Sequence, residues 1–210
     1  MTSRSALALY RLLFSLLALA AVVVQLADLA DKGVLNPVNY FSYFTIQSNL
    51  IGVAVLLVGA ATWRATRSST MDLARGGAAL YLTITFVVFA LLLSGTDVDT
   101  AIPWVNTVLH QVFPIVVIVD WLIDPPLARL TLRQSLVWLV YPLAWLAYTL
   151  VRGAVVGWYP YPFLDPANGG YASVAAYVVA ILVFGIVLCA IVVAIGNALN
   201  ARRRVVQPAG

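Results

Sequence analysis

Six apolar segments, each long enough to cross a lipid bilayer, take up most of this chain of 210 residues. An α-helix rises about 1.5 Å per residue, so about 20 apolar residues cover the roughly 30 Å hydrocarbon core of a membrane. Hydrophobic residues make up 63% of the chain and charged residues 10%, a balance that excludes a soluble globular protein. The sequence therefore predicts an all-α membrane protein, with residues 1–210 forming a single six-transmembrane-helix bundle. The predicted spans are residues 7–26, 43–63, 77–94, 103–123, 135–151 and 172–195.

The basic residues predict which way the bundle faces. If six helices alternate across the membrane, ten of the twelve Lys and Arg residues fall on one side, and only Lys32 and Arg152 fall on the other. Cytoplasmic loops are enriched in Lys and Arg, so the N- and C-termini are both predicted to be cytoplasmic. We attribute the net charge of +4 to this topology and expect no nucleic-acid partner. The first span resembles a signal peptide, but its apolar core continues to Leu26 and five spans follow, so we expect a retained helix.

The second predicted span opens with a polar stretch, NYFSYFTIQSNL at residues 39–50. At 100° per residue most of its polar side chains fall on one face together with Gly52 and Gly59, whereas Gln47 points elsewhere. Small and hydroxylated residues of this kind often hold membrane helices together. They could instead form one wall of a polar cavity, and the spacing alone leaves both interpretations open. The polar residues on the shared face are Ser42, Thr45, Ser48 and Asn49.

His110, the only histidine, lies in the fourth span, PWVNTVLHQVFPIVVIVDWL. It follows Pro103 by seven residues, which places it on the order of 10 Å below the outer membrane surface. An ionisable group at that depth is costly and is therefore a functional candidate. The alternative is a histidine with satisfied hydrogen bonds inside a packed core. One histidine with no carboxylate within a turn does not predict a metal site, and we expect Cys189 to be a buried structural thiol.

Thr45 and His110 are predicted to lie at about the same depth, because both helices run inward from the outer face. A threonine hydroxyl beside an imidazole in a dry cavity is the minimal arrangement for an activated nucleophile, with the histidine as base. Asp120 cannot orient the imidazole, since it lies about 15 Å further along the helix and some 80° off its face. Asn106, one turn above His110, is better placed to do so. The outer loop 95–102 carries two aspartates that would reach the ring only if that loop folded inward.

The fifth span and the loop that follows it are rich in aromatic residues. The loop, RGAVVGWYPYPFLDPANGGY, combines interfacial aromatics such as Trp158 and Tyr161 with several prolines. Irregular chain at membrane depth is tolerated only against protein or a cavity, so we predict a lid over the outer mouth of the bundle. The stripe in the span predicts either aromatic packing with a snorkelling arginine or an acyl-chain groove ending in a cation. The stripe consists of Tyr141, Trp145, Tyr148 and Arg152.

Three segments resemble the androgen-induced-gene family of multi-pass membrane hydrolases, whose animal members cleave fatty acid esters of hydroxy fatty acids. YFTIQSN is similar to the family's aromatic-x-Thr segment, which implies that Thr45 is the nucleophile. WVNTVLHQVFPIVVIVDWL is similar to its Asn-x-x-x-His segment, which implies that His110 is the base, and GWYPYPFLD is similar to the loop before its last helix. The chain departs from the family in having Asp120 in place of a glutamate and no histidine after His110. In this it looks more like the bacterial branch, which implies a bacterial cytoplasmic (inner) membrane.

Together these features predict an intramembrane hydrolase of lipid esters, with a membrane lipid or fatty-acyl ester as its partner and no metal or other cofactor. Thr45 and His110 would be catalytic, and Ser48, Asn49 and Asn106 would support the pair or the oxyanion. Two alternatives are a proton-coupled small-molecule transporter that uses His110 as a relay, and a non-enzymatic lipid-binding or assembly protein. The apolar inner halves of the second and fourth spans disfavour the transporter. The expected substrate-binding residues are Tyr141, Trp145, Tyr148, Arg152, Trp158 and Tyr161.

Overall fold

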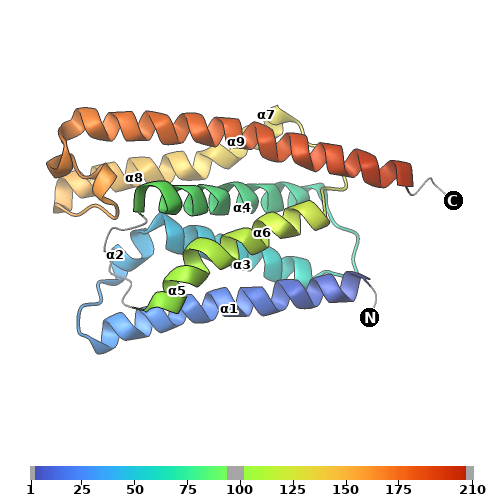
Figure 1. Cartoon of the computed structure of the whole chain (residues 1–210), viewed down its shortest axis with the longest axis horizontal. Helices are drawn as coiled ribbons and strands as arrows, with labels where there is room; N and C mark the ends of the chain where they lie inside the picture. The colour runs from blue at the N-terminus through green and yellow to red at the C-terminus, as the bar shows by residue number, and fades with distance from the viewer. Residues whose placement is uncertain (1–2, 94–101, 207–210) are drawn as a thin grey trace.

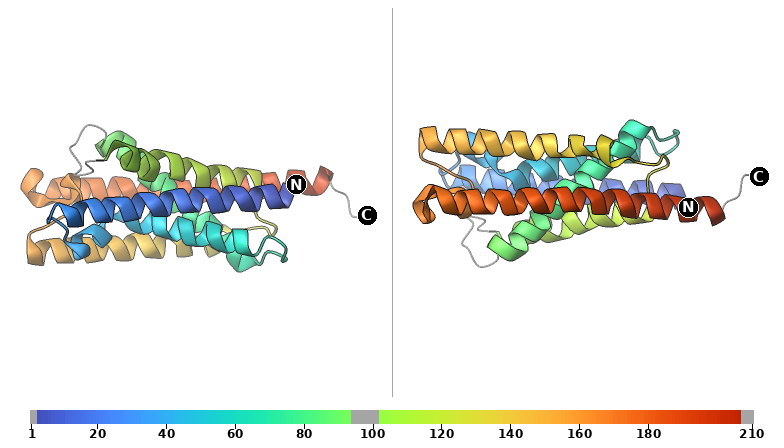
Figure 2. Two further views of the ribbon diagram at one scale, coloured as in Figure 1. Left: turned by 90° about the horizontal axis from the view of Figure 1, so that it is seen from below. Right: turned by 90° about the horizontal axis from the view of Figure 1, so that it is seen from above.

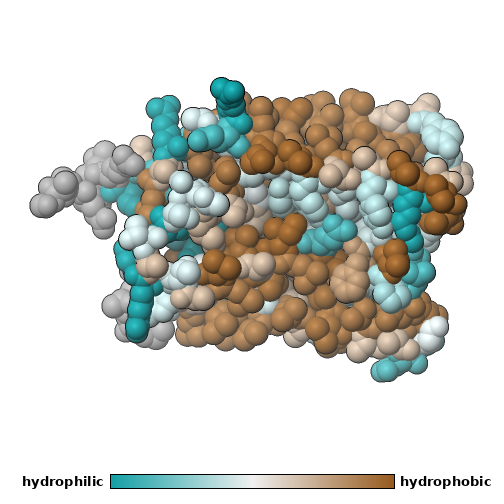
Figure 3. All heavy atoms as spheres, turned by 180° about the vertical axis from the view of Figure 1, so that it is seen from behind, coloured by the Kyte–Doolittle hydropathy of each residue, from teal (hydrophilic) through white to brown (hydrophobic). Residues whose placement is uncertain are grey.

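The computed structural model describes residues 3–93 and 102–206, and within these ranges the chain forms helices joined by short loops, without a β-strand. Six of the helical segments are long and apolar enough to cross a membrane, which confirms the predicted six-helix bundle. Both ends of the described chain lie at the same end of the bundle, as an even number of spans requires (Figure 1). Hydrophobic residues cover much of the middle of the molecule, and hydrophilic residues gather towards its two ends (Figure 3). The protein is therefore an integral membrane protein.

Breaks divide several of the spans into shorter elements. The first span is α1 (Ser3–Asp31), and the second is α3 (Phe44–Ala61), which follows the short α2 (Pro37–Ser42). The third is α4 (Ser69–Val88) continued by the π-helical η1 (Phe89–Leu93). The fourth comprises α5 (Pro103–Thr107), the π-helical η2 (Val108–Val112) and α6 (Phe113–Ile123). The fifth comprises α7 (Leu132–Ser135), η3 (Leu136–Leu139) and α8 (Val140–Val156), and the last is α9 (Gly170–Val206). The outer loop before α9 contains η4 (Pro162–Leu164) and η5 (Pro166–Asn168).

The third span is longer than the sequence predicts. The prediction places its start at residue 77, whereas α4 begins at Ser69. The added turns contain Asp72 and Arg75, which are buried inside the protein rather than exposed in a loop. A hydropathy pattern ends at charged residues, but the helix continues because Asp72 pairs with Arg67 in the preceding loop and Arg75 pairs with Asp120 on α6.

The second span begins at Phe44 because the chain is extended at Tyr43 (φ −67°, ψ 129°). Ser42 therefore belongs to α2, and its predicted place on the helix face that carries Thr45 is wrong. Ser42 is nevertheless buried, and its Oγ lies 2.9 Å from the hydroxyl of Tyr148 on α8. The break separates this serine from the polar face without exposing it.

Helices α1, α3, α4 and α6 pack together, and α8 and α9 lie along one side of this group (Figures 1 and 2). A Cβ added at Gly52 of α3 would lie 2.7 Å from Leu82 and 2.9 Å from Phe113, so this glycine permits close helix packing. Thr45, at the outer end of the same face, instead lines a cavity. The two interpretations of this face thus hold for different halves of it. Cys189 is a buried free thiol, as predicted.

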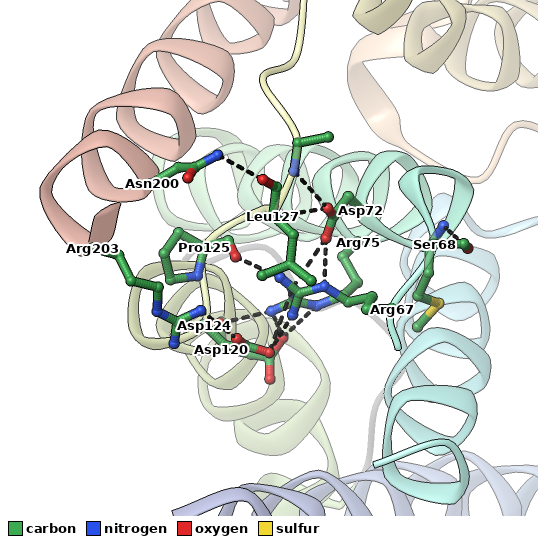
Figure 4. A network of polar contacts seen from close by, with 12 residues as sticks. Arg67, Ser68, Asp72, Arg75, Asp120, Asp124, Pro125, Leu127, Asn200 and Arg203 are labelled. Atoms are coloured by element: carbon green, nitrogen blue, oxygen red, sulfur yellow. Dashed lines mark hydrogen bonds and ion pairs between the residues drawn. The ribbon is translucent and has the colours of Figure 1, made fainter. Parts of the chain in front are cut away.

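A buried network of arginines and aspartates joins several helices and the loops between them (Figure 4). Asp120 accepts hydrogen bonds from Arg11 Nε and Arg75 Nη2, each at 2.6 Å. Asp72, which is fully buried, pairs with Arg67 Nε at 2.5 Å. The sequence pattern marks these arginines only as topology signals and does not indicate this structural role. Asp120 is committed to the network, in keeping with the expectation that it does not orient His110.

Candidate active site

Thr45 is the second residue of α3 and is buried, with 6% of its surface exposed. The first turn of a helix leaves backbone N–H groups without partners inside the helix, and the N-cap residue Tyr43 supplies no side-chain hydrogen bond. The Thr45 N–H instead donates to the hydroxyl of Tyr161, 3.2 Å away. The outer loop therefore caps α3 at the residue that carries the candidate nucleophile.

His110 lies in η2, where the fourth span loosens into a π-helical turn, a feature that is frequent at functional sites. Its ring stacks on Phe89 with the ring centroids 4.2 Å apart. Nδ1 lies 3.1 Å from the backbone carbonyl of Asn106, and because a carbonyl only accepts, Nδ1 carries the proton. In a neutral imidazole this leaves Nε2 as an acceptor. The contact expected from Asn106 thus comes from its main chain, and its buried side-chain Oδ1 has no hydrogen-bond partner among the described residues.

The structure brings Thr45 and His110 together, with Oγ1 3.3 Å from Nε2. The hydroxyl of Tyr161 lies 3.2 Å from the same Oγ1. One set of protons satisfies the whole chain of contacts. The Thr45 hydroxyl donates to Nε2, and the Tyr161 hydroxyl donates to Oγ1 while its oxygen accepts from the Thr45 N–H. In this arrangement the threonine proton points at the base that would remove it.

Ser48 and Asn49, predicted to support the catalytic pair, are fully buried and bond to the backbone behind it. Asn49 Nδ2 donates to the carbonyls of Thr45 at 2.7 Å and Leu109 at 3.0 Å, so one amide ties α3 to η2. Ser48 Oγ lies 3.1 Å from the Thr45 carbonyl and 2.9 Å from Thr85 Oγ1. Both side chains therefore position Thr45 from behind. Thr85 is a partner that the sequence pattern does not indicate, because its helix contains no polar run.

The aromatic stripe of α8 holds the corner between α2 and α3. Trp145 Nε1 donates to the backbone carbonyl of Ser42 at 2.9 Å, beside the Tyr148 contact to the same residue. Tyr141 donates to Gln47 Oε1 at 3.0 Å, which gives a partner to the one polar residue that points away from the Thr45 face. These bonds fix the start of α3, and thereby Thr45, against the fifth span.

Arg152, predicted to bind a substrate carboxylate, is occupied by groups of the protein. Its Nη2 donates to Asn39 Oδ1 at 2.6 Å, and its guanidinium lies 5.0 Å from the ring centroid of Trp158. Trp158 in turn packs edge-on against Tyr43, with centroids 5.6 Å apart. The structure thus brings Arg152 and Trp158 together at the outer loop, whereas it brings Tyr161 to Thr45.

The outer loop folds inward over the site, as the sequence predicts. Gly157 turns the chain back with a φ of 69°, a conformation that favours glycine. Tyr161 and Leu164 of this loop are buried, with 5% and 1% of their surfaces exposed. Burial raises the pKa of Tyr161 to about 12, although its hydrogen bonds with Thr45 act in the opposite direction. The phenol therefore stays protonated at neutral pH and can donate a hydrogen bond.

Two cavities meet at Thr45. A polar cavity of about 160 Å³ is lined by His110, Thr45 and Tyr161. An apolar cavity of about 90 Å³ lies between α8 and α9 and also reaches Thr45 and Tyr161, but not His110. The Thr45 hydroxyl thus lies at the boundary between a polar space, which the imidazole faces, and an apolar one. The amide side chains that line the polar cavity are Gln25, Asn36 and Asn39.

Comparison with protein-family models finds no matching family, and comparisons with curated proteins and with solved structures find no match either. Within residues 3–93 and 102–206, no three His, Cys, Asp or Glu side chains are grouped so that they could hold a metal ion. Asp97 and Asp99, the two aspartates of the outer loop that would reach His110 only if that loop folded inward, lie outside the described residues. Fold and site define a six-helix membrane protein with a buried threonine–histidine pair where two cavities meet.

Proposed function

We propose that the protein is an intramembrane hydrolase of lipid esters that uses Thr45 as nucleophile and His110 as general base. The observation that carries this proposal is the 3.3 Å contact between Thr45 Oγ1 and a His110 Nε2 whose role as acceptor is fixed by the bond from Nδ1. A hydroxyl becomes an effective nucleophile when an adjacent base removes its proton during attack. The three segments that resemble the androgen-induced-gene hydrolases support the same two residues.

In the first step, Thr45 Oγ1 attacks the ester carbonyl carbon while its proton passes to His110 Nε2. The carbonyl oxygen becomes an oxyanion, for which the Tyr161 hydroxyl and the Thr45 N–H are the nearest donors to the nucleophile. The substrate oxygen would take over the Thr45 N–H from the Tyr161 oxygen, which then only donates. The partial positive charge at the N-terminus of α3 favours negative charge at the same point.

In the second step, the bond between the carbonyl carbon and the alcohol oxygen breaks, and His110 gives its proton to the departing alkoxide. Water, deprotonated by the same Nε2, then attacks the acyl-threonine, releases the fatty acid and restores the Thr45 hydroxyl. Because His110 lines the polar cavity, both the alcohol and the water can reach its ring from that side. The chain's own residues supply each proton transfer.

The packing below the pair favours a hydrolase over a transporter. Proton-coupled transport through His110 would need a polar path towards the inner end of the bundle. Inward of Ser48 and Asn49, the buried side chains of Val53 and Leu56 on α3 and of Phe113 on α6 are apolar. A lipid-binding protein without activity would leave an ester intact, so turnover by purified protein separates that alternative from the proposal.

Hydrolysis of a fluorogenic acyl ester by the purified, detergent-solubilised protein tests the proposal. Thr45→Ala and His110→Ala should each lower the rate by about 10²-fold or more, since each removes a participant in proton transfer. Thr83→Ala is a matched control, because the Thr83 hydroxyl bonds to the Ala79 carbonyl of its own helix. Rates for the folded Thr45 and His110 variants equal to that of Thr83→Ala would show the proposal to be wrong.

We further propose that the protein lies in a bacterial inner membrane and that both of its termini are on the cytoplasmic side. Most of the Lys and Arg residues lie on the same side of the six-span topology as the two termini, which supports this orientation. In a Cys189→Ser background, a cysteine replacing the exposed Val34 should react with a membrane-impermeant maleimide in intact spheroplasts. A cysteine replacing Arg202 should react only after lysis, and the reverse pattern would overturn the orientation.

A further inference from the structure

The apolar cavity beside Thr45 has its polar groups at one end. Its lining is hydrocarbon and aromatic apart from Thr45, Thr85 and Tyr161. These three lie together, because Tyr161 contacts Thr45 directly and Thr85 contacts Ser48, one turn from Thr45 along α3. A ligand that matches this cavity therefore has one reactive polar end and an otherwise apolar body.

The cavity runs along two helices rather than forming a rounded hole. Its lining on the fifth span extends from Leu146 of α8 to Leu139, the last residue of η3, and on α9 from Val178 to Gly185. Seven residue steps along each span correspond to a length of roughly 10 Å. An extended hydrocarbon chain fits this shape better than a compact or ring-shaped group.

The cavity also borders the surface that faces lipid. Leu143 of α8 lines it with 45% of its surface exposed, and Ile181 and Leu182 of α9 are partly exposed along the opposite wall. Helices α8 and α9 lie at the periphery of the bundle (Figures 1 and 2). The cavity between them therefore borders the surrounding lipid. An acyl chain already dissolved in the bilayer would reach Thr45 by this route without crossing water.

Gly185 lies at the end of the cavity away from Thr45, beside Leu139 and Ile84. A Cβ added there would lie 3.6 Å from Leu139 Cδ2 and 4.0 Å from Ile84 Cδ1, which is ordinary contact. At Gly196 on the same helix, by contrast, an added Cβ would lie 2.6 Å from Trp121. Gly185 is therefore not required for close packing, and its missing side chain leaves room at the end of the cavity.

We infer that this cavity is the acyl-chain site, that the chain enters laterally from the bilayer between α8 and α9, and that Gly185 sets the length it accepts. The inference rests on the proposed hydrolase function. It places the acyl part of the ester on the apolar side of Thr45 and the alcohol part in the polar cavity. His110 lines the polar cavity and not the apolar one, so its proton is available on the side where the alcohol departs.

Chain-length selectivity tests the role of Gly185. Rates are measured on 4-nitrophenyl esters from acetyl to palmitoyl for the wild type, Gly185→Leu and Val183→Leu. Val183 is a matched control because it lies two residues away on α9 with 55% of its surface exposed. Gly185→Leu should lose roughly tenfold or more on the longer chains while it keeps the rate on acetyl, because the added side chain fills the end of the cavity. Equal loss on all chains, or no change in selectivity, would overturn the inference.

A second measurement does not depend on turnover. A non-hydrolysable octanoyl ketone with a terminal diazirine is photo-crosslinked to wild-type and Thr45→Ala protein in bilayer nanodiscs, and the adducts are mapped by mass spectrometry. Adducts should lie on the peptides that contain Leu139 and Gly185, and Gly185→Leu should reduce them while Val183→Leu does not. Adducts elsewhere would reject the acyl-chain site. If esters are not hydrolysed but these adducts form, the proposed function fails and the apolar site stands.

Discussion

The hydroxyl of Tyr161 lies 3.2 Å from both the backbone nitrogen and the Oγ1 of Thr45, although 116 residues separate the two in the chain. One loop side chain thus caps α3 and contacts the candidate nucleophile at the same time. Closure of the outer loop and assembly of the site are therefore coupled, because Tyr161 can reach Thr45 only when the loop is folded inward.

Tyr161→Phe should lower the rate of ester hydrolysis by about 10²- to 10³-fold, the loss typical of removing one oxyanion donor. The phenyl ring would keep its stacking contact with Phe163, so the loop should remain in place. The effect should fall on kcat more than on KM, since the lost bond forms in the transition state. Tyr159→Phe, in the same loop, is the control, and equal rates for the two variants would contradict this role for Tyr161.

Asn49→Ala should lower both stability and activity. It would leave the buried carbonyls of Thr45 and Leu109 without this donor, at a cost of about 1 to 3 kcal/mol. Thr45 and His110 would also lose the amide that ties their helices together, so activity per folded molecule should fall. Asn197→Ala is the matched control, because Asn197 makes a similar pair of bonds to the backbone of Leu130 far from the site. The two variants should melt earlier by similar amounts, and only Asn49→Ala should lose specific activity; equal specific activity would show that Asn49 has no positioning role.

Asp120→Ala should destabilise the protein by about 3 to 5 kcal/mol, because it removes the carboxylate closest to the buried guanidinium groups of Arg11 and Arg75. Asp28→Ala removes only a partly exposed pair with Lys32 and should cost less than about 1 kcal/mol. Thermal unfolding in detergent measures both. A similar small loss for the two variants would mean that the inner network contributes little.

Acid should weaken the same network through Asp124, just beyond the end of α6. Burial alone would raise the pKa of this carboxyl, but the guanidinium groups of Arg75, Arg67 and Arg11 lower it below the ordinary value of 3.8. A carboxylate whose pKa falls on folding contributes stability that is full above its unfolded pKa and is lost as the pH falls through its folded pKa. Melting temperature should therefore drop below about pH 4, and Asp124→Asn should reduce that drop. Asp31→Asn, at the outer end, should leave it unchanged, and an identical acid profile for Asp124→Asn would contradict the prediction.

The six spans could be predicted because long apolar segments in a membrane leave the backbone little choice but to form helices. The depth match of Thr45 and His110 followed from the same regularity, since residue number converts to depth along a straight helix. Ser42 departs from the prediction because the chain is extended at Tyr43, and no hydropathy pattern marks such a break. The start of α4 departs from it because Asp72 and Arg75 look like loop residues until their buried ion pairs are known.

The hydrogen bonds of the site depend on local backbone conformation, which residue spacing in the sequence does not specify. The sequence suggests the Asn106 side chain as a partner of His110, but the π-helical turn presents the Asn106 carbonyl to the ring instead. The sequence places Tyr161 among the substrate-binding residues, but its contact with Thr45 depends on the loop turning back at Gly157. The sequence predicts Arg152 as a carboxylate-binding residue, but in the structure its guanidinium contacts Asn39 and Trp158.

Identification of the residue that forms the covalent intermediate tests the Thr45–His110 mechanism most directly. The purified protein is treated with an alkyl fluorophosphonate, and the modified peptide is sequenced by tandem mass spectrometry. The adduct should lie on Thr45 in the wild type and should be absent from folded His110→Ala protein, because the hydroxyl then lacks its base. An adduct on another residue, or undiminished labelling of Thr45 without His110, would contradict the mechanism.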